Sequence, residues 1–522
     1  MSDQNEKSSE TKQDAVWADV REWGAVGDGV TNDTTAIQRA IDACAQAGGG
    51  VVRLHSGRFL SGTVMLRSNV ELHLSATARL LGVTGLSLYH RDTITRYVAI
   101  NRSLIYANGC ENIAITGQGT IDGQGSVFRR DMEHAHGVKW FDVAERSGRP
   151  ILVRLRDCKN VRIEGVLLTN SPSLAINPIH CQQVRIEGVR VKSRVMPNND
   201  CLGVDGCQDV FISNCNFSSD DDCIALRTTE PGLPCTDIVI TNCVLSSGCA
   251  AIRVGPDAVT NIERVSASNC VIRDTRLNGI KIQEVYGAVM RDMVFSNMVM
   301  DNVAGPISIR LAGWKMGSEN PWSVRDDSRW PEGRLENILF DNIRARVMPD
   351  YFKLGIWITG TSQTRPKNIT FSNIDITFPG GGTAEDAARR NVPDHEREYP
   401  ETGMFGTLPA YGLYVHHADG ITLNNVRFDV VSDELRPAID CDDVTNLELA
   451  GFRASGNVQA ESLIRLQNTR RAFITGSRPL NLISTFVRVE GAGSEQICLR
   501  NNVMDLAAKE MELACEDSNP EG

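Results

Sequence analysis

Carboxylates gather at two places in the sequence that lie roughly one structural repeat apart. The first group ends at Asp200, and the second contains the consecutive acids Asp220, Asp221 and Asp222. Adjacent like charges destabilise a fold unless they are exposed, paired or functional. Clustered carboxylates also push their pKa values apart, which leaves one acid protonated beside ionised partners, as glycosidic-bond hydrolysis requires. A solvated acidic turn and a calcium site are the alternatives that this spacing leaves open.

A short repeat that runs through most of the chain must position these acids. An alternating apolar segment ends in a small or amide residue, as in VRIEGV at residues 161–166 and again at 184–189. The asparagines that close four later copies are 28, 27 and 28 residues apart: Asn214, Asn242, Asn269 and Asn297. A period of 23 to 28 residues with alternation inside each unit predicts a β-solenoid with about three short strands per coil. Leucine-rich repeats share the period, but their LxxLxL pattern is missing.

In such a solenoid, equivalent residues of successive coils lie side by side. The recurring asparagines are expected at turns in the left-handed conformation, where their side chains can stack as an amide ladder. Asp200 and Asp221 are 21 residues apart, which is close to one coil. We therefore expect Asp200 to lie beside the Asp221–Asp222 pair, about 5 Å away.

A solenoid must also cover its open ends. Residues 33–47 predict a helix that Asp33 or Thr34 caps and that glycines end. This helix would cover the first coil through one apolar stripe, made of Ile37, Ala40, Ile41 and Cys44.

Two long segments interrupt the repeat. Residues 315–334 and 378–411 are too long for solenoid turns and predict loops that wall a groove. The expected organisation is a disordered tail over residues 1–15, a catalytic solenoid domain over 16–505, and an acidic tail over 506–522 in which we expect a frayed helix.

Composition excludes several classes of protein. With 54 basic and 65 acidic residues, the chain has a net charge of -11, which does not attract nucleic acid or an anionic membrane surface. The sequence contains no run of 18 apolar residues, so no membrane span is predicted.

The 15 cysteines include no CxxC pair, which favours buried free thiols over a zinc site. The polar N-terminus lacks a signal-peptide core, so the sequence as it stands predicts a cytoplasmic protein, or a secreted one if a signal was removed.

Several stretches resemble the polygalacturonase family, glycoside hydrolase family 28. VREWGAVGDG at residues 20–29 is similar to the start of many pectin-active enzymes, and YPE at 399–401, MFG at 404–406 and LPAYG at 408–412 are similar to bacterial members. The resemblance covers about residues 20–500. It implies an all-β fold, a single-stranded right-handed parallel β-helix, with a carbohydrate as substrate and no cofactor.

Two catalytic motifs of this family match closely. Its Asn-Thr-Asp motif resembles Asn198-Asn199-Asp200, and its Asp-Asp-Cys motif matches Asp221-Asp222-Cys223. The resemblance implies that Asp221 is the general acid. It implies that Asp200 and Asp222 activate the water that inverts the anomeric centre, and that Asn198 contacts the substrate.

Two further motifs depart from the family. Cys249 stands where a Gly-His-Gly motif has its histidine, and Lys281 and Gln283 stand where an Arg-Ile-Lys motif has the two cations that hold a uronate carboxylate. Arg253 is a nearby cation that could compensate for the loss. Trp314 lies near the sequence position where the family often has a tyrosine, and it suits either stacking on a sugar or anchoring a loop. These changes predict a carbohydrate hydrolase that is not a standard polygalacturonase.

Two other functions stay open. A polysaccharide lyase on a uronate glycan would use a basic residue such as Lys281 or Arg253. A non-catalytic carbohydrate-binding β-helix would explain the lost histidine and lysine, although it has no reason to keep three stacked acids. No metal site is predicted, because the adjacent His416 and His417 would point to opposite faces of a strand.

Overall fold

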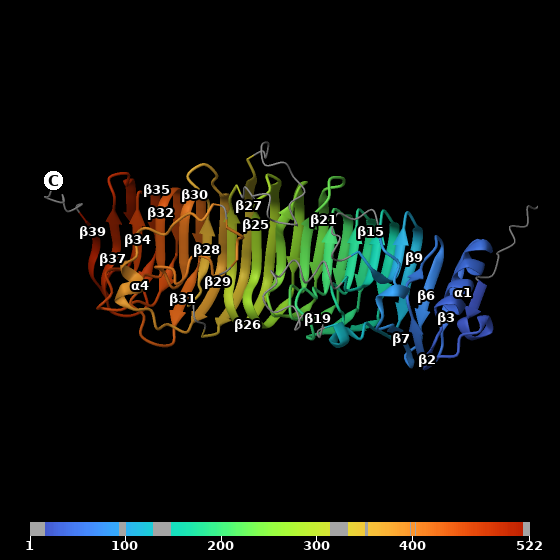
Figure 1. Ribbon diagram of the computed structural model, residues 1–522. Helices are drawn as coiled ribbons and strands as arrows, with labels where there is room; N and C mark the ends of the chain where they lie inside the picture. The colour runs from blue at the N-terminus through green and yellow to red at the C-terminus, as the bar shows by residue number, and fades with distance from the viewer. Residues whose placement is uncertain are drawn as a thin grey trace, which may run out of the picture.

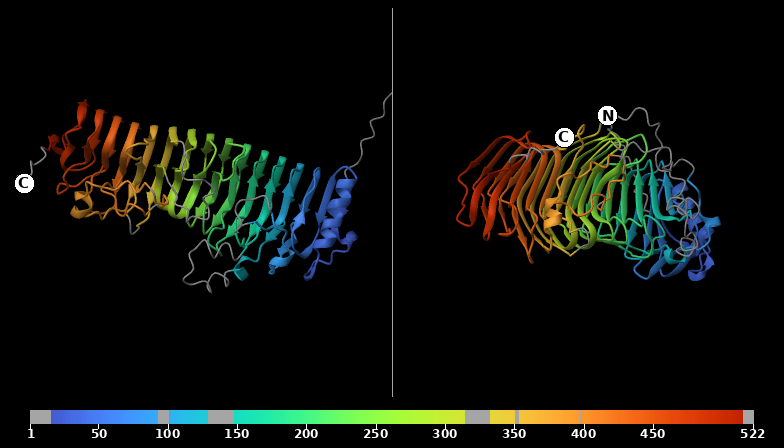
Figure 2. Two further views of the ribbon diagram at one scale, coloured as in Figure 1. Left: turned by 45° about the horizontal axis from the view of Figure 1, so that its top comes forward. Right: turned by 60° about the vertical axis from the view of Figure 1, so that its left-hand side comes forward.

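The chain forms one long β-helix whose coils follow one another along a single axis (Figures 1 and 2). The computed structural model describes residues 16–92, 101–128, 148–313, 332–349, 353–396, 398–401 and 403–514. Helix α1 (Thr34–Gln46) lies at the N-terminal end, and the last strands lie at the opposite end. The predicted all-β parallel β-helix is therefore confirmed.

Each coil contributes strands to three parallel ladders. The first ladder carries the acids discussed below and contains β5 (Val64–Met65), β8 (Ser103–Asn108), β11 (Ile151–Arg156), β14 (Ile176–Ile179), β17 (Leu202–Asp205), β20 (Ile224–Thr228), β23 (Ala250–Ala258), β28 (Ile356–Thr359), β34 (Ile464–Gln467), β37 (Ile483–Glu490) and β39 (Ala507–Leu513). The second contains β1 (Val16–Asp19), β3 (Gly50–Leu54), β6 (Val70–Leu74), β9 (Glu111–Gly117), β12 (Lys159–Glu164), β15 (Gln182–Glu187), β18 (Gln208–Ser213), β21 (Cys235–Thr241), β24 (Ile262–Ser268), β35 (Arg470–Thr475) and β38 (Glu495–Arg500).

The third ladder contains β2 (Asp28–Asn32), β4 (Gly57–Ser61), β7 (Ala78–Gly82), β10 (Thr120–Asp122), β13 (Leu167–Thr169), β16 (Arg190–Ser193), β19 (Asn216–Ser219), β22 (Val244–Ser247), β31 (Arg427–Val430), β33 (Arg453–Ala454) and β36 (Arg478–Pro479). Six longer strands pass from one ladder to another: β25 (Val271–Glu284), β26 (Val289–Leu311), β27 (Arg334–Val347), β29 (Lys367–Phe378), β30 (Leu413–Asn424) and β32 (Ile439–Ala450). Short 3-10 turns cover Val20–Trp23, Leu86–Leu88 and Gly125–Phe128.

The register of the ladders follows the sequence repeat. Val161 pairs with Val184, and Val184 pairs with Val210, so the apolar residues of successive coils stack inside the β-helix. Asn242 adopts a φ of 56°, and its side chain donates to the amide oxygen of Asn214 at 3.4 Å. The predicted left-handed turns and amide ladder are thus confirmed. Every described cysteine is a free thiol, and all but Cys249 and Cys498 are buried.

Helix α1 buries the predicted stripe against the first coil. Ile37, Ala40, Ile41 and Cys44 are all buried. Asp33 occupies the N-cap position, but its carboxylate does not cap the helix. It accepts instead from the peptide N–H groups of Val26 and Gly27, at 2.7 and 3.0 Å. The predicted capping role of Asp33 was therefore wrong, because the preceding turn competes for the same carboxylate.

The C-terminal end of the chain differs from the predicted organisation, and most of the N-terminal end is not described. The stretch after Asp505 is not a helix, because β39 forms there and pairs in parallel with β37. The β-helix consequently extends to Leu513, and the predicted frayed helix was wrong. The predicted tail over residues 1–15 lies outside the described residues. Within the described ranges, none of the helices is long and apolar enough to cross a membrane.

Residues 379–412 form a loop between β29 and β30, where the second interruption was predicted. This loop, called the 379–412 loop below, contains the short helix α4 (Ala384–Ala388), which begins with a capping box. A small apolar cluster joins it to the outer side of the first ladder: Trp357, Val392, Phe405, Leu408, Ala410 and Tyr414. Residues 315–331 of the other predicted interruption lie outside the described residues.

Candidate active site

The acids meet where two neighbouring strands of the first ladder begin. Asp200 shortly precedes β17, and Asp221 and Asp222 shortly precede β20. The two strands pair with Leu202 beside Ile224, and the peptide N–H of Cys201 donates to the carbonyl oxygen of Asp222 at 3.0 Å. The coil at this point is therefore 22 residues long (224 minus 202), which makes Asp222 the direct neighbour of Asp200.

Asp200 and Asp222 are buried and paired with arginines. Their exposed fractions are 2% and 0%. Arg227 forms an ion pair with Asp200 and lies 3.7 Å from Asp222, while Arg253 Nη1 lies 3.2 Å from Asp222 Oδ2. Burial raises the pKa of Asp200, and the positive charge of Arg227 opposes that rise. The acids are thus neither a solvated turn nor an open cluster suited to calcium, since arginines already neutralise two of them.

Asp221 has different surroundings. It is partly exposed, and no arginine is paired with it among the described contacts. Its Oδ2 accepts from Asn198 Nδ2 at 3.1 Å, and its Oδ1 accepts from the peptide N–H of Asp222 at 3.0 Å. Burial and the negative charges of Asp200 and Asp222 raise the pKa of Asp221 to about 8. A protonated carboxyl at neutral pH beside two arginine-paired carboxylates can donate a proton while its neighbours accept one.

Arg253 is held by three protein groups. Besides Asp222, it donates through Nη2 to Gln283 Oε1 at 3.1 Å and to the hydroxyl of Tyr399 at 2.7 Å. Gln283 is fully buried, and its Nε2 donates to the carbonyl oxygen of Pro400. The predicted substrate-binding residues Arg253 and Gln283 therefore meet each other and the 379–412 loop.

Lys281 lies beside Arg253 in the first ladder and is fully buried. Its ammonium group forms an ion pair with Glu401 of the 379–412 loop. The loop thus brings a carboxylate to the place where the resemblance implies a bound uronate.

Cys249 lies at the rim of the acid cluster. One ligand atom each of Cys249, Asp221 and Asp222 lie within 4.8 Å of one another. Burial and the charge of Asp222 raise the pKa of the Cys249 thiol well above its usual value. A thiol that stays protonated is a poor nucleophile and a poor metal ligand, so Cys249 is better suited to contacting a substrate. Trp314, the remaining predicted substrate-binding residue, lies outside the described residues.

Three residues of the site were missed in the sequence. Arg227 could have been found from the alternation of side chains in β20. It lies two residues after Ala225, which pairs with Arg253, so Arg227 and Arg253 lie on the same face of the first ladder. The sequence indicated Tyr399 and Glu401 only as part of a stretch that resembles the family. Nothing in their spacing indicates contact with Arg253 and Lys281, which precede them by 146 and 120 residues.

Comparison with known proteins places the chain in a family. Residues 56–396 match the family described as glycosyl hydrolases family 28, and residues 17–77 match one described as rhamnogalacturonase A/epimerase, pectate lyase-like. A probable polygalacturonase of Vitis vinifera is 28% identical over 327 residues, which cover 58% of this chain and 63% of the relative. An endo-polygalacturonase of Pectobacterium carotovorum subsp. carotovorum is 25% identical over 362 residues, 66% of this chain and 84% of the relative.

Solved structures show the same fold. An exopolygalacturonase from Thermotoga maritima aligns with a TM-score of 0.56 at 23% identity, covering 70% of this chain and 87% of that one. A polygalacturonase from Erwinia carotovora ssp. carotovora aligns with a TM-score of 0.54 at 21% identity, covering 67% and 92%. The predicted right-handed parallel β-helix is confirmed. The match to the family model covers residues 56–396, which is well over half of this chain, so the chain belongs to glycosyl hydrolases family 28.

Proposed function

We propose that this protein is an inverting glycoside hydrolase that acts on a pectin-like or related plant-type glycan. Membership of glycosyl hydrolases family 28 supports the reaction class. The observation that carries the proposal is the contrast between Asp221, whose pKa is raised to about 8, and its neighbours Asp200 and Asp222, which are paired with arginines. Two carboxylates in different protonation states are what the hydrolysis of a glycosidic bond requires.

In the proposed mechanism, Asp221 transfers its proton to the glycosidic oxygen as the bond between that oxygen and the anomeric carbon breaks. Asp200 and Asp222 accept a proton from a water molecule, whose oxygen bonds to the anomeric carbon from the opposite face. The product has the inverted configuration. Asp200 and Asp222 then release the accepted proton to solvent, and Asp221 takes up a proton from solvent. The positive charges of Arg227 and Arg253 favour the ionised form of Asp200 and so oppose the effect of its burial, and Arg253 also pairs with Asp222.

We further propose that the sugar bound beside Lys281 and Gln283 is neutral. Lys281 is already paired with Glu401, and the Nη atoms of Arg253 are engaged by Asp222, Gln283 and Tyr399. A uronate carboxylate would have to displace Glu401 to reach the Lys281 ammonium group. A hydroxyl group can instead accept from or donate to the amide and carboxylate groups that line this position.

The reaction class is tested by product analysis. The protein is incubated with oligogalacturonate, rhamnogalacturonan and neutral aryl glycosides, and the first product is examined by proton NMR and ultraviolet absorbance. A reducing sugar of inverted configuration is expected. Net retention would contradict the proposed roles of the acids, and an unsaturated, ultraviolet-absorbing product would identify a polysaccharide lyase. If no substrate is cleaved but glycan binding is retained, the protein is a carbohydrate-binding β-helix.

A further inference from the structure

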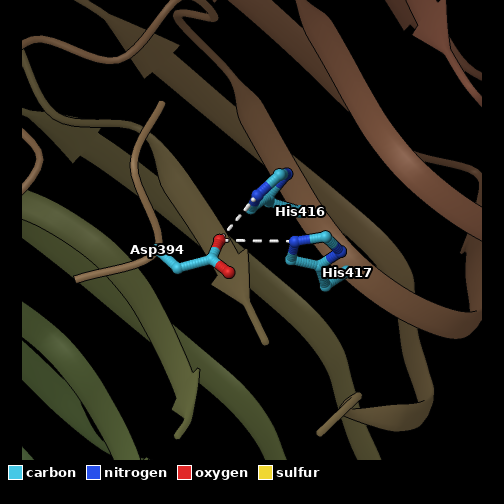
Figure 3. A group of neighbouring side chains, drawn as sticks. All are labelled: Asp394, His416 and His417. Atoms are coloured by element: carbon cyan, nitrogen blue, oxygen red, sulfur yellow. Dashed lines mark hydrogen bonds and ion pairs between the residues drawn. The ribbon is translucent and has the colours of Figure 1, made fainter. Parts of the chain in front are cut away.

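Two histidines and an aspartate converge on the first ladder away from the catalytic acids (Figure 3). His416 Nε2 lies 3.0 Å from Asp394 Oδ1, and His417 Nε2 lies 3.3 Å from the same oxygen. His416 and His417 belong to β30, and Asp394 comes from the 379–412 loop. His416 is buried, whereas the side chains of His417 and Asp394 are 13% and 25% exposed.

The prediction that adjacent histidines point to opposite faces was wrong for this pair. His417 has a φ of 53°, because the chain turns from the first ladder into the second at this residue although the strand continues. The turn places the two imidazole rings on the same side, with their centroids 3.8 Å apart. Alternation of side chains holds only for extended backbone, and His417 interrupts it.

Each imidazole also faces a second carboxylate through its other nitrogen. His416 Nδ1 lies 3.2 Å from Asp442 Oδ2, and His417 Nδ1 lies 2.6 Å from Asp443 Oδ2. Asp442 is the ladder neighbour of His416, so the next coil supplies this contact. Asp443 can accept the Nδ1 proton of His417, which would leave the Nε2 lone pair of that ring to face a metal, as the outer carboxylates of metal-bound histidines do.

We propose that Asp394, His416 and His417 bind a divalent transition metal, with Zn²⁺ as the best fit. Ligand atoms of all three residues lie within 4.8 Å of one another. In a tetrahedral zinc site with bonds of about 2.0–2.1 Å, neighbouring ligand atoms lie about 3.3 Å apart. The measured separations of 3.0 and 3.3 Å are close to that value. Two imidazole nitrogens favour zinc over calcium or magnesium, which prefer oxygen ligands.

The site is distinct from the catalytic acids, but the 379–412 loop runs from it to Arg253, which pairs with Asp222. His416 follows Gln283 by three steps along the first ladder, through Arg310 and Thr359, which is about 14 Å at the usual strand spacing. Asp394 precedes Tyr399 and Glu401, the loop residues that contact Arg253 and Lys281. A metal at Asp394 would therefore fasten to the β-helix the part of the loop that reaches the catalytic site.

Metal binding by the full-length protein tests the proposal directly. After treatment with EDTA and its removal, the wild-type protein is expected to bind one Zn²⁺ per chain by elemental analysis and calorimetry. One Co²⁺ should bind in the same place and give the strong visible absorption of a tetrahedral or five-coordinate site. Asp394→Asn and His417→Gln should each lose stoichiometric binding, and Asp443→Asn should weaken binding by about 10–100-fold.

His73→Gln serves as the matched control, because His73 is also paired with a carboxylate, Glu71, but lies near the N-terminal end of the second ladder. It should bind Zn²⁺ as the wild type does. If the ligand variants fail to fold, the wild-type Co²⁺ spectrum still decides the matter. Absence of stoichiometric Zn²⁺ and Co²⁺ binding to the wild type would mean that Asp394 contacts the two histidines without a metal, and would overturn the proposal.

Discussion

The ammonium group of Lys281 forms an ion pair with the carboxylate of Glu401, which lies 120 residues further along the chain. Lys281 is fully buried, whereas the side chain of Glu401 is 42% exposed. The protein therefore supplies its own carboxylate to a cation that we propose lies beside the bound sugar. The proposed preference for a neutral sugar depends on the presence of that carboxylate.

Replacing Glu401 should change which sugars are accepted. In Glu401→Gln the Lys281 charge is no longer neutralised by the loop and becomes available to a substrate carboxylate. A charge-assisted hydrogen bond contributes about 1.5–3 kcal/mol, so kcat/KM on oligogalacturonate should rise by about tenfold or more relative to a neutral substrate. Glu398→Gln, a change at a loop carboxylate that pairs with His395 instead, should leave the ratio unchanged.

The wild type gives a complementary measurement. Its kcat/KM should be about ten- to a hundredfold lower on oligogalacturonate than on its neutral or rhamnose-containing substrate, because Arg253 and Lys281 are already paired with Asp222 and Glu401. The opposite preference, lost in Arg253→Ala, would show that Arg253 replaces the missing cation and that the neutral-sugar proposal is wrong.

Asp221→Asn should abolish most turnover without unfolding the protein. An amide cannot deliver a proton, and general acid catalysis contributes about 10²–10⁴-fold. Steady-state kinetics measure the loss of kcat. Asp220→Asn changes the adjacent acid, which is partly exposed and lies 3.9 Å from Arg194, and should keep near wild-type activity. Equal losses in the two variants would refute the assignment of Asp221 as the acid.

Activity should decline in alkaline solution. Asp221 must be protonated to donate, and its pKa is about 8, so kcat is expected to fall as the pH rises above about 8. A pH–rate profile on the best substrate checks this limb. A limb that appears several units lower would mean that substrate binding or another group controls the proton donor.

The same shift of Asp221 predicts a pH-dependent stability. Its pKa is higher in the folded protein than in the unfolded chain, so the protonated carboxyl favours folding below about pH 4 and this contribution is lost as the pH rises toward 8. Asp221→Asn cannot ionise and should melt about 2 °C or more above the wild type at pH 8. The difference should shrink at pH 4, and scanning calorimetry at both pH values measures it.

Arg227 should stabilise the fold mainly by neutralising Asp200. Removing one partner of a buried ion pair leaves the other charge uncompensated, and Arg227→Gln should lower the free energy of unfolding by roughly 3 kcal/mol. Denaturant titration gives this value. The double variant Arg227→Gln, Asp200→Asn should recover most of the loss, because no buried charge then remains unpaired. If the double variant is as unstable as the single one, packing rather than charge explains the effect.

The sequence by itself determined the β-helix and the meeting of the acids. Alternating apolar residues and turn asparagines recur once per coil, so VRIEGV at residues 161–166 stacks on its copy at 184–189. The spacing of Asp200 from Asp221 and Asp222 is also close to one coil. These features are visible in one dimension because each repeat binds the next through the same local pattern.

Tertiary structure decided what the 379–412 loop brings to the first ladder. Its path depends on packing against Trp357 and Tyr414, which follows no sequence period, so the pairing of Glu401 with Lys281 could not be read from spacing. The backbone turn at His417 was likewise hidden, because adjacent histidines look like neighbours in an ordinary strand. Long-range contacts and single-residue backbone geometry are set by the packed whole, and only the folded chain reveals them.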